Sequence, residues 1–148
     1  ARSIQAGSDL EIVELGGKKM AFYQLYKDVT RRNQAPNPEG FERAIESMHP
    51  YIERIYFIPT NYRVYYKHLH QTEILPDAQW QYLDGICRKH QLRCTNLTAP
   101  LVQESDRLLK KGELTWWGDD THWNRRGIAV AARVVASDLA PTKSPAKP

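Results

Sequence analysis

Short apolar runs alternate along the chain with stretches in which apolar residues recur at helical spacing. Three runs, Leu10–Leu15, Ile55–Ile58 and Leu92–Leu97, are bounded by Gly, Pro or polar residues, which is typical of buried strands. Less regular segments lie between them. We expect residues 20–26 to start a helix or form an ordered loop, and residues 60–66 to form a loop after Pro59 stops the second strand.

Helical spacing of apolar residues predicts four helices, each with a recognisable start. The first is expected to end near Met48, the third to stop at Gly112, and residues 116–123 to form the loop before the fourth. The capping and first-turn residues are Asn37 with Pro38, Asp77, Thr98 with Pro100, and Asn124. The apolar stripe of the last helix consists of Ile128, Ala131, Val134, Val135 and Leu139.

The order of these elements predicts an α/β fold. Strands that alternate with helices favour right-handed crossovers and a mainly parallel sheet covered on both faces, so we expect three layers, α/β/α. Residues 1–140 would form one domain, and the Pro- and Lys-rich tail, 141–148, would be flexible. Functional loops of such sheets lie beyond the carboxyl ends of the strands, which would place residues 16–22 and 59–66 at one rim.

Composition narrows the function classes only a little. The 148 residues, 41% of them hydrophobic, suffice for one core, and no apolar run approaches the roughly 20 residues that cross a bilayer. The net charge of +4 comes from scattered short pairs, so no nucleic-acid partner is expected. Cys87 and Cys94 are compatible either with a disulfide or with two free thiols, and their spacing does not match a zinc site. No metal or cofactor is expected.

Residues 116–127, WWGDDTHWNRRG, combine the side chains that acid–base chemistry requires. His122 has Asp119 and Asp120 close by in sequence, and a histidine that acts as a general base needs an acid to hold its tautomer and stabilise the imidazolium. Asn124 would fix the loop at the start of the last helix, and Gly127 would let that helix approach a neighbour closely.

The string DDTHWNRRG resembles the last conserved block of the SGNH (GDSL-type) hydrolase superfamily. Its DTHWN form is similar to the polysaccharide O-acetyltransferase and esterase-like branch related to the alginate acetylation proteins. Residues 55–66, IYFIPTNYRVYY, and 96–101, NLTAPL, resemble other blocks of that branch in the same order. The resemblance covers residues 41–139 and implies an SGNH or flavodoxin-like three-layer domain, which could be incomplete in this chain.

What the resemblance implies is acyl transfer by a Ser-His-Asp triad on an acylated polysaccharide or another ester substrate, in a periplasmic or secreted protein. His122 would be the base; Asp-x-x-His spacing selects Asp119 as its acid, whereas the Asp-x-His spacing of the alginate-type branch selects Asp120, which we favour. The expected substrate-binding rim consists of Trp116, Trp117, Trp123 and Tyr62.

The nucleophile block of the superfamily, Gly-Asp-Ser or Gly-Thr-Ser, is absent from this sequence. Ser8 precedes the first strand and would lie at the wrong end of the sheet, so we expect the serine upstream of Ala1. If residues 10–19 match the later Gly-x-Asn-Asp block, Gly17 or Lys18 would serve the oxyanion in place of the missing Asn. The alternative is a non-catalytic relative that uses its aromatic rim to bind a glycan or a partner protein.

Overall fold

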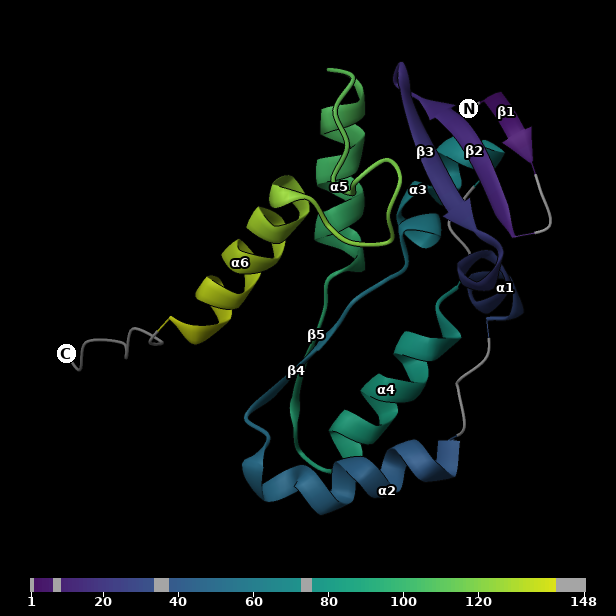
Figure 1. The fold of residues 1–148 in the computed structure, drawn as a ribbon. Coiled ribbons are helices and arrows are strands. Elements are labelled where there is room, and N and C mark those ends of the chain that lie inside the picture. The colour runs from purple at the N-terminus through teal and green to yellow at the C-terminus, as the bar shows by residue number, and fades with distance from the viewer. Residues whose placement is uncertain (1, 7–8, 34–37, 73–75, 141–148) are drawn as a thin grey trace.

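The computed structural model describes residues 2–6, 9–33, 38–72 and 76–140, and it shows a mixed α/β protein (Figure 1). Its elements are β1 (Arg2–Ala6), β2 (Leu10–Leu15), β3 (Lys18–Tyr23), α1 (Gln24–Arg32), α2 (Pro38–Met48), the 3₁₀ turn η1 (His49–Tyr51), β4 (Arg54–Phe57), α3 (Asn61–His70), α4 (Ala78–Lys89), β5 (Arg93–Asn96), α5 (Thr98–Leu109) and α6 (Arg125–Leu139). The predicted cap at Asn37, the candidate Ser8 and the tail at 141–148 lie outside the described residues.

The strand predicted at Leu10–Leu15 is present as β2, but it does not belong to a parallel sheet. Gly16 and Gly17 have φ angles of +56° and +76° and close a two-residue turn, after which β3 returns along β2 from the Leu15–Lys18 pair. A turn this short joins only antiparallel strands. β1 also pairs antiparallel with β2, so this sheet has the order β1-β2-β3.

The two later strands form a separate, parallel pair. β4 and β5 align in register from Arg54 opposite Arg93 to Phe57 opposite Asn96, with α3 and α4 in the connection between them. Within the described residues the two sheets remain apart, and the expectation of one mainly parallel sheet is corrected to a three-stranded antiparallel sheet and a two-stranded parallel one. In Figure 1, α3 and α5 lie beside the antiparallel sheet, whereas α2 and α4 lie at the other end of β4 and β5.

The prediction of a loop over residues 60–66 is wrong beyond Thr60, because α3 begins at Asn61. The Thr60 side chain accepts a hydrogen bond from the backbone N–H of Arg63 at 3.2 Å, which is an N-cap. Tyr62 and Tyr65 of this helix are at most 1% exposed. α3 packs against α1 and α5, so it is a central helix of the core.

A network of hydrogen bonds and one ion pair connects α1, α3 and α4. Asn33 ends α1 with a left-handed φ of +46°, and its Oδ1 accepts hydrogen bonds from the Ala78 N–H at 2.9 Å and from Arg63 Nη2 at 3.3 Å. Arg63, which is 2% exposed, also lies 3.2 Å from Asp77 Oδ2. Asp77 in turn caps α4 through the Trp80 N–H, as the sequence predicts. The buried guanidinium is therefore paired, which offsets its cost of burial.

The core joins the antiparallel sheet, α3, α5 and the first half of α6. Its buried members are Val13, Leu15, Met20, Phe22, Tyr62, Val64, Tyr65, Leu97, Leu101, Leu114, Trp116 and Val130. The apolar stripe predicted for α6 is partly wrong, because Ile128 and Leu139 are more than half exposed and Val130 is the buried residue. Ala131 and Val134 do pack against the core.

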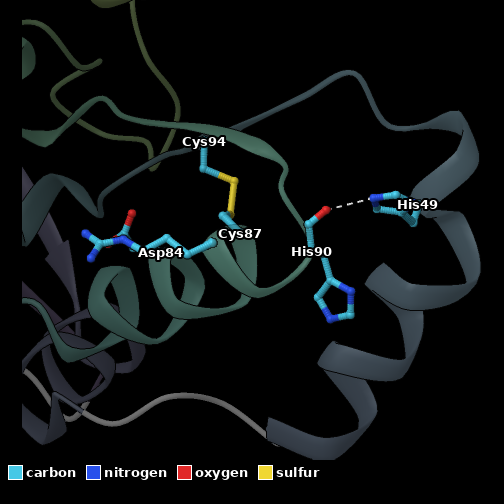
Figure 2. The surroundings of a disulfide bond; sticks show 6 residues. His49, Asp84, Cys87, His90 and Cys94 are labelled. Carbon is cyan, nitrogen blue, oxygen red and sulfur yellow. Dashed lines mark hydrogen bonds and ion pairs between the residues drawn. A yellow bond between two sulfur atoms is a disulfide. The ribbon is translucent and has the colours of Figure 1, made fainter.

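Cys87 at the end of α4 and Cys94 in β5 form a disulfide, with 6.1 Å between their Cα atoms (Figure 2). The two alternatives for these cysteines are thus resolved in favour of the bridge. Among the helices of the described residues, none combines the length and the apolar character needed to cross a bilayer.

Candidate functional site

The loop that carries Asp120 and His122 starts from a buried anchor at Thr115, which is 0% exposed. The Thr115 N–H donates to the hydroxyl of Tyr65 at 2.9 Å, and its Oγ1 lies 2.9 Å from the same hydroxyl and 2.6 Å from Ser105 Oγ. Burial raises the pKa of Tyr65, so the phenol stays protonated and able to donate. Contacts with α3 and α5 therefore position the first residue of the loop.

Asn124 holds the other end of the loop. Its Oδ1 accepts from the backbone N–H of Arg126 at 2.8 Å and of Gly127 at 3.3 Å, which confirms the predicted cap of α6. Its Nδ2 donates to the carbonyls of Leu114 at 2.7 Å and Trp116 at 3.0 Å. One side chain thus fixes both the start of α6 and the opposite strand of the loop.

Two glycines allow the loop to approach its neighbours closely. A Cβ on Gly118 would lie less than 3.0 Å from the carbonyl oxygen of Lys19, and the Gly118 carbonyl accepts a hydrogen bond from Ala21 N–H at 2.6 Å. A Cβ on Gly127 would likewise lie less than 3.0 Å from the carbonyl oxygen of Thr115. The loop therefore rests against β3 on one side and against α6 on the other; in Figure 1 it projects from α5 toward β3 before it enters α6.

Indole rings fill the inside of the loop. Trp116 and Trp123 form an antiparallel bridge, and their rings meet edge to face with centroids 6.2 Å apart. Trp116 Nε1 donates to the Thr121 carbonyl at 3.1 Å, and the Trp117 N–H donates to the His122 carbonyl at 3.2 Å. These contacts fold residues 116–123 into a closed turn with Asp119, Asp120 and His122 at its outer end.

The turn places His122 directly beside Asp120. His122 Nδ1 lies 2.8 Å from Asp120 Oδ1, and the same oxygen accepts from the Thr121 N–H at 2.5 Å. The hydrogen bond with His122, followed by the one from Thr121, holds the pKa of Asp120 below its usual range, so the carboxylate is ionised at neutral pH. An ionised acceptor at Nδ1 favours the tautomer with hydrogen on Nδ1 and leaves Nε2 free to take up a proton.

Asp119 faces elsewhere. It lines a different pocket, over β2 and β3, together with Lys19, Tyr23 and Gly118, and its carbonyl accepts from the Tyr23 hydroxyl at 3.3 Å. Geometry therefore pairs the imidazole with the second of the two adjacent aspartates.

The His122 ring borders an open, mainly apolar pocket of about 340 Å³. Its lining consists of Ile58, Thr121, His122, Trp123 and Ile128. The His122 side chain is 80% exposed, so the ring nitrogen not bonded to Asp120 can reach a group that enters this pocket. The sequence analysis did not identify Ile58 and Ile128 as site residues. Ile58 directly follows a strand and Ile128 lies on the first turn of a helix, and both apolar side chains are more than half exposed, which is the feature that could have indicated them.

The expected aromatic rim is only partly present. Trp117 is 53% exposed and Trp123 lines the pocket. Trp116 and Tyr62, in contrast, are 2% and 1% exposed, which contradicts a substrate-facing place for them. Tyr62 is occupied inside the core, where its hydroxyl lies 2.6 Å from His70 Nε2 and accepts from Arg31 Nε at 3.2 Å.

Gly17 and Lys18 lie at the end of the β2–β3 hairpin. The adjacent Gly16 packs against the Leu109 carbonyl and Gly112, and it lines a pocket with residues of α3 and α5. Among the residues that the structure describes, none from the hairpin turn lines the pocket beside His122. The structure therefore does not bring these two residues together with the Asp120–His122 pair.

Within the described part of the chain, no serine hydroxyl lines the pocket beside His122. Ser105 is fully buried and bonded to Thr115, and both cysteines are in the disulfide. The hydroxyl in the pocket lining is that of Thr121, which lies 3.4 Å from Asp120 Oδ1. The described residues that line this pocket thus include an imidazole paired with a carboxylate, but no serine or cysteine side chain.

No protein-family model matches the chain, and no curated protein matches its sequence. Among solved structures, the chain is similar to the O-acetyltransferase domain of AlgJ from Pseudomonas putida, with a TM-score of 0.49 and 15% sequence identity. The match covers 98% of this chain and 51% of that one, so the chain spans about half the length of the structure it resembles.

Proposed function

We propose that this chain supplies the Asp–His pair of an SGNH-type esterase or O-acetyltransferase, with the nucleophilic serine on a segment outside this chain. The observation that carries the proposal is the 2.8 Å contact between His122 Nδ1 and Asp120 Oδ1 on a braced loop, with the rest of the imidazole open to a pocket. The motif resemblance at residues 119–127 adds the reaction class to that geometry.

The chemistry follows from the charge states of the pair. The Asp120 carboxylate orients the imidazole and stabilises the positive charge that forms when Nε2 takes the proton of a serine hydroxyl. The serine oxygen then attacks the acyl carbonyl, the ester bond to the donor alcohol breaks, and the imidazolium returns its proton to that leaving oxygen. An acceptor hydroxyl or water then removes the acyl group by the same steps in reverse.

An exposed ion pair contributes little to folding stability, because water screens its charges and both side chains lose freedom. His122 is 80% and Asp120 49% exposed, yet the backbone around them is fixed by buried contacts of Asn124 and Thr115. A rigid support around an exposed pair favours a functional role.

The disulfide favours a periplasmic or secreted location, since such bonds persist in oxidising compartments.

Labelling with a fluorophosphonate tests the proposal. The full natural protein that contains this chain should become labelled on a serine, and it should hydrolyse a chromogenic aryl acetate. A His122→Gln variant should lose roughly 10²- to 10⁴-fold in that hydrolysis, the usual contribution of a general base, with unchanged thermal unfolding. Absence of labelling together with full activity of the variant would contradict the proposal.

A second candidate function is glycan binding without catalysis. It is favoured by the exposed Trp117, the apolar lining at Ile58 and Ile128, and the lack of a serine hydroxyl beside His122 among the residues that the structure describes. This function predicts measurable binding of an acetylated polysaccharide by the full protein, loss of binding in Trp117→Ala, and no release of acetate. Acetate release that depends on His122 decides for the enzyme.

A further inference from the structure

A second group of titratable side chains lies far along the chain from Asp120 and His122, where α2 meets the end of α4. Glu42 and Glu46 are one helical turn apart on α2, and His90 is the residue that follows α4. One ligand atom from each lies within 4.8 Å of those of the other two. Glutamate and histidine are both residue types that hold zinc and similar divalent cations in proteins.

His90 Nε2 has no hydrogen-bond partner, although it is inaccessible to solvent. It lies 3.6 Å from Glu42 Oε1 and 3.6 Å from Glu46 Oε1, too far for hydrogen bonds to either carboxylate. A buried polar atom without a partner costs about 1–3 kcal/mol. A cation between the ring and the two carboxylates would satisfy all three groups at once.

The separations suit a tetrahedral ion. Ligand atoms about 2.0–2.1 Å from Zn²⁺ at tetrahedral angles are about 3.3 Å apart. The two measured separations from His90 Nε2 exceed that value by only a few tenths of an ångström. A rotamer adjustment of Glu42 and Glu46, whose side chains are 29% and 46% exposed, would close this difference.

Lys89 currently neutralises part of this charge. Its Nζ lies 2.6 Å from Glu42 Oε1 and 4.0 Å from Glu46 Oε1. Because the Lys89 side chain is 62% exposed, the ion pair is weak and the ammonium can move into solvent when a divalent ion arrives.

His90 is held in place from two sides. His49 Nε2 donates to the His90 carbonyl at 2.9 Å, and the Cys87–Cys94 bridge closes the short segment that contains His90 (Figure 2). In Figure 2 the His90 ring lies on the side of this segment that faces α2. His49 belongs to the 3₁₀ turn η1, which follows α2 directly. The site is thus preorganised by a second helix and a covalent link.

We propose that Glu42, Glu46 and His90 form a zinc-binding site that joins α2 to the end of α4, with the fourth position open to water. Sequence spacing does not predict this site, because His90 is more than forty residues from the two glutamates and only the fold brings them together. The i, i+4 spacing of Glu42 and Glu46 on one helix is the signal that could have indicated one half of the site.

Zinc binding to the tag-free full natural protein, measured by competition with a chromogenic chelator, tests the site. The wild type should bind one Zn²⁺. In Glu46→Gln and in His90→Gln the affinity for Zn²⁺ should fall by more than the roughly 10- to 100-fold that follows loss of an outer-shell partner. Co²⁺ in place of Zn²⁺ should show the visible absorption of a tetrahedral site. Lys89→Gln should bind Zn²⁺ several-fold more tightly.

The matched control is Glu39→Gln, an exposed glutamate one turn earlier on α2, which should leave the affinity unchanged. Thermal unfolding of each variant in EDTA shows whether the apo fold is intact. The proposal is overturned if the wild type binds no Zn²⁺, or if Glu46→Gln and His90→Gln retain the wild-type stoichiometry and affinity while folded.

Discussion

At the scale of single residues, Asp120 performs two tasks with one oxygen atom. Oδ1 accepts from the Thr121 N–H, which shapes the turn, and it contacts His122 Nδ1, which orients the imidazole. The neighbouring Asp119 has the same side chain one position earlier but faces the pocket over β2 and β3. The chain therefore contains its own matched control for the role of the acid.

Replacing each aspartate by Asn separates the two tasks. In Asp120→Asn the amide oxygen can still accept from Thr121, but a neutral side chain cannot stabilise an imidazolium, so ester hydrolysis by the full protein should fall roughly 10²- to 10⁴-fold. Asp119→Asn should stay near the wild-type rate. Steady-state hydrolysis of an aryl acetate measures both, and equal losses would show that the pairing with Asp120 is not what matters.

The titration of Asp120 reports the same contact without reference to activity. Its folded-state pKa is lowered below the ordinary 3.8, first by the His122 hydrogen bond. The contact therefore stabilises the folded state at pH values above 3.8. This stabilisation is lost as the pH falls through the lowered pKa of Asp120. NMR titration of the carboxyl carbon should show an upward shift of the Asp120 pKa in His122→Ala. An unchanged value would contradict the hydrogen bond in solution.

At the scale of elements, α6 depends on a glycine at its first turn. Helix propensity alone would make Gly127→Ala stabilising by about 1 kcal/mol. The added Cβ, however, would lie less than 3.0 Å from the Thr115 carbonyl oxygen, and Thr115 is itself fixed by Tyr65. We expect the clash with the Thr115 carbonyl to outweigh the gain in helix propensity, so that Gly127→Ala lowers the free energy of unfolding by about 1–3 kcal/mol.

Gly85 is the control for this prediction. It lies in α4, where an added Cβ meets nothing within 4 Å, so Gly85→Ala should stabilise the protein by up to about 1 kcal/mol. Urea unfolding of the two variants measures both effects. If Gly127→Ala also stabilised the protein, the close approach of α6 to the loop would be wrong.

Local signals predicted the elements that begin with a polar cap, and tertiary packing decided the others. Asp77 and Asn124 marked α4 and α6 correctly, because a side-chain oxygen on the first free N–H groups acts within one turn. α3 was missed because a loop was expected after Pro59 and its three Tyr and one Val are weak helix formers; the Thr60 cap and packing against α1 and α5 favour the helix. For the candidate site, the Asp-x-His spacing indicated which of the two aspartates lies beside His122. The exposure of Trp117 and the burial of Trp116, in contrast, depend on how the loop folds.

At the scale of the whole molecule, two sets of contacts connect α2, α4 and β5. One is the Cys87–Cys94 bridge between α4 and β5, and the other is the set of polar contacts from α2 to Lys89 and His90. In Figure 1, α2 lies at the opposite end of β4 and β5 from the antiparallel sheet. The Asp120–His122 loop rests on that sheet and on α6 instead, so the two ends can be tested independently.

The variant that removes the bridge, Cys87→Ser with Cys94→Ser, should therefore affect one end and spare the other. Opening a segment with a sequence separation of 7 releases chain entropy worth about 2.5 kcal/mol in the unfolded state, and the free energy of unfolding should fall by about that amount. Zinc affinity should fall as well, because His90 lies inside the opened segment. Ester hydrolysis should keep its wild-type rate at temperatures where the variant is folded. A parallel loss of zinc binding and hydrolysis would show that the two ends are coupled, and wild-type protein treated with a thiol reductant should reproduce the stability of the variant.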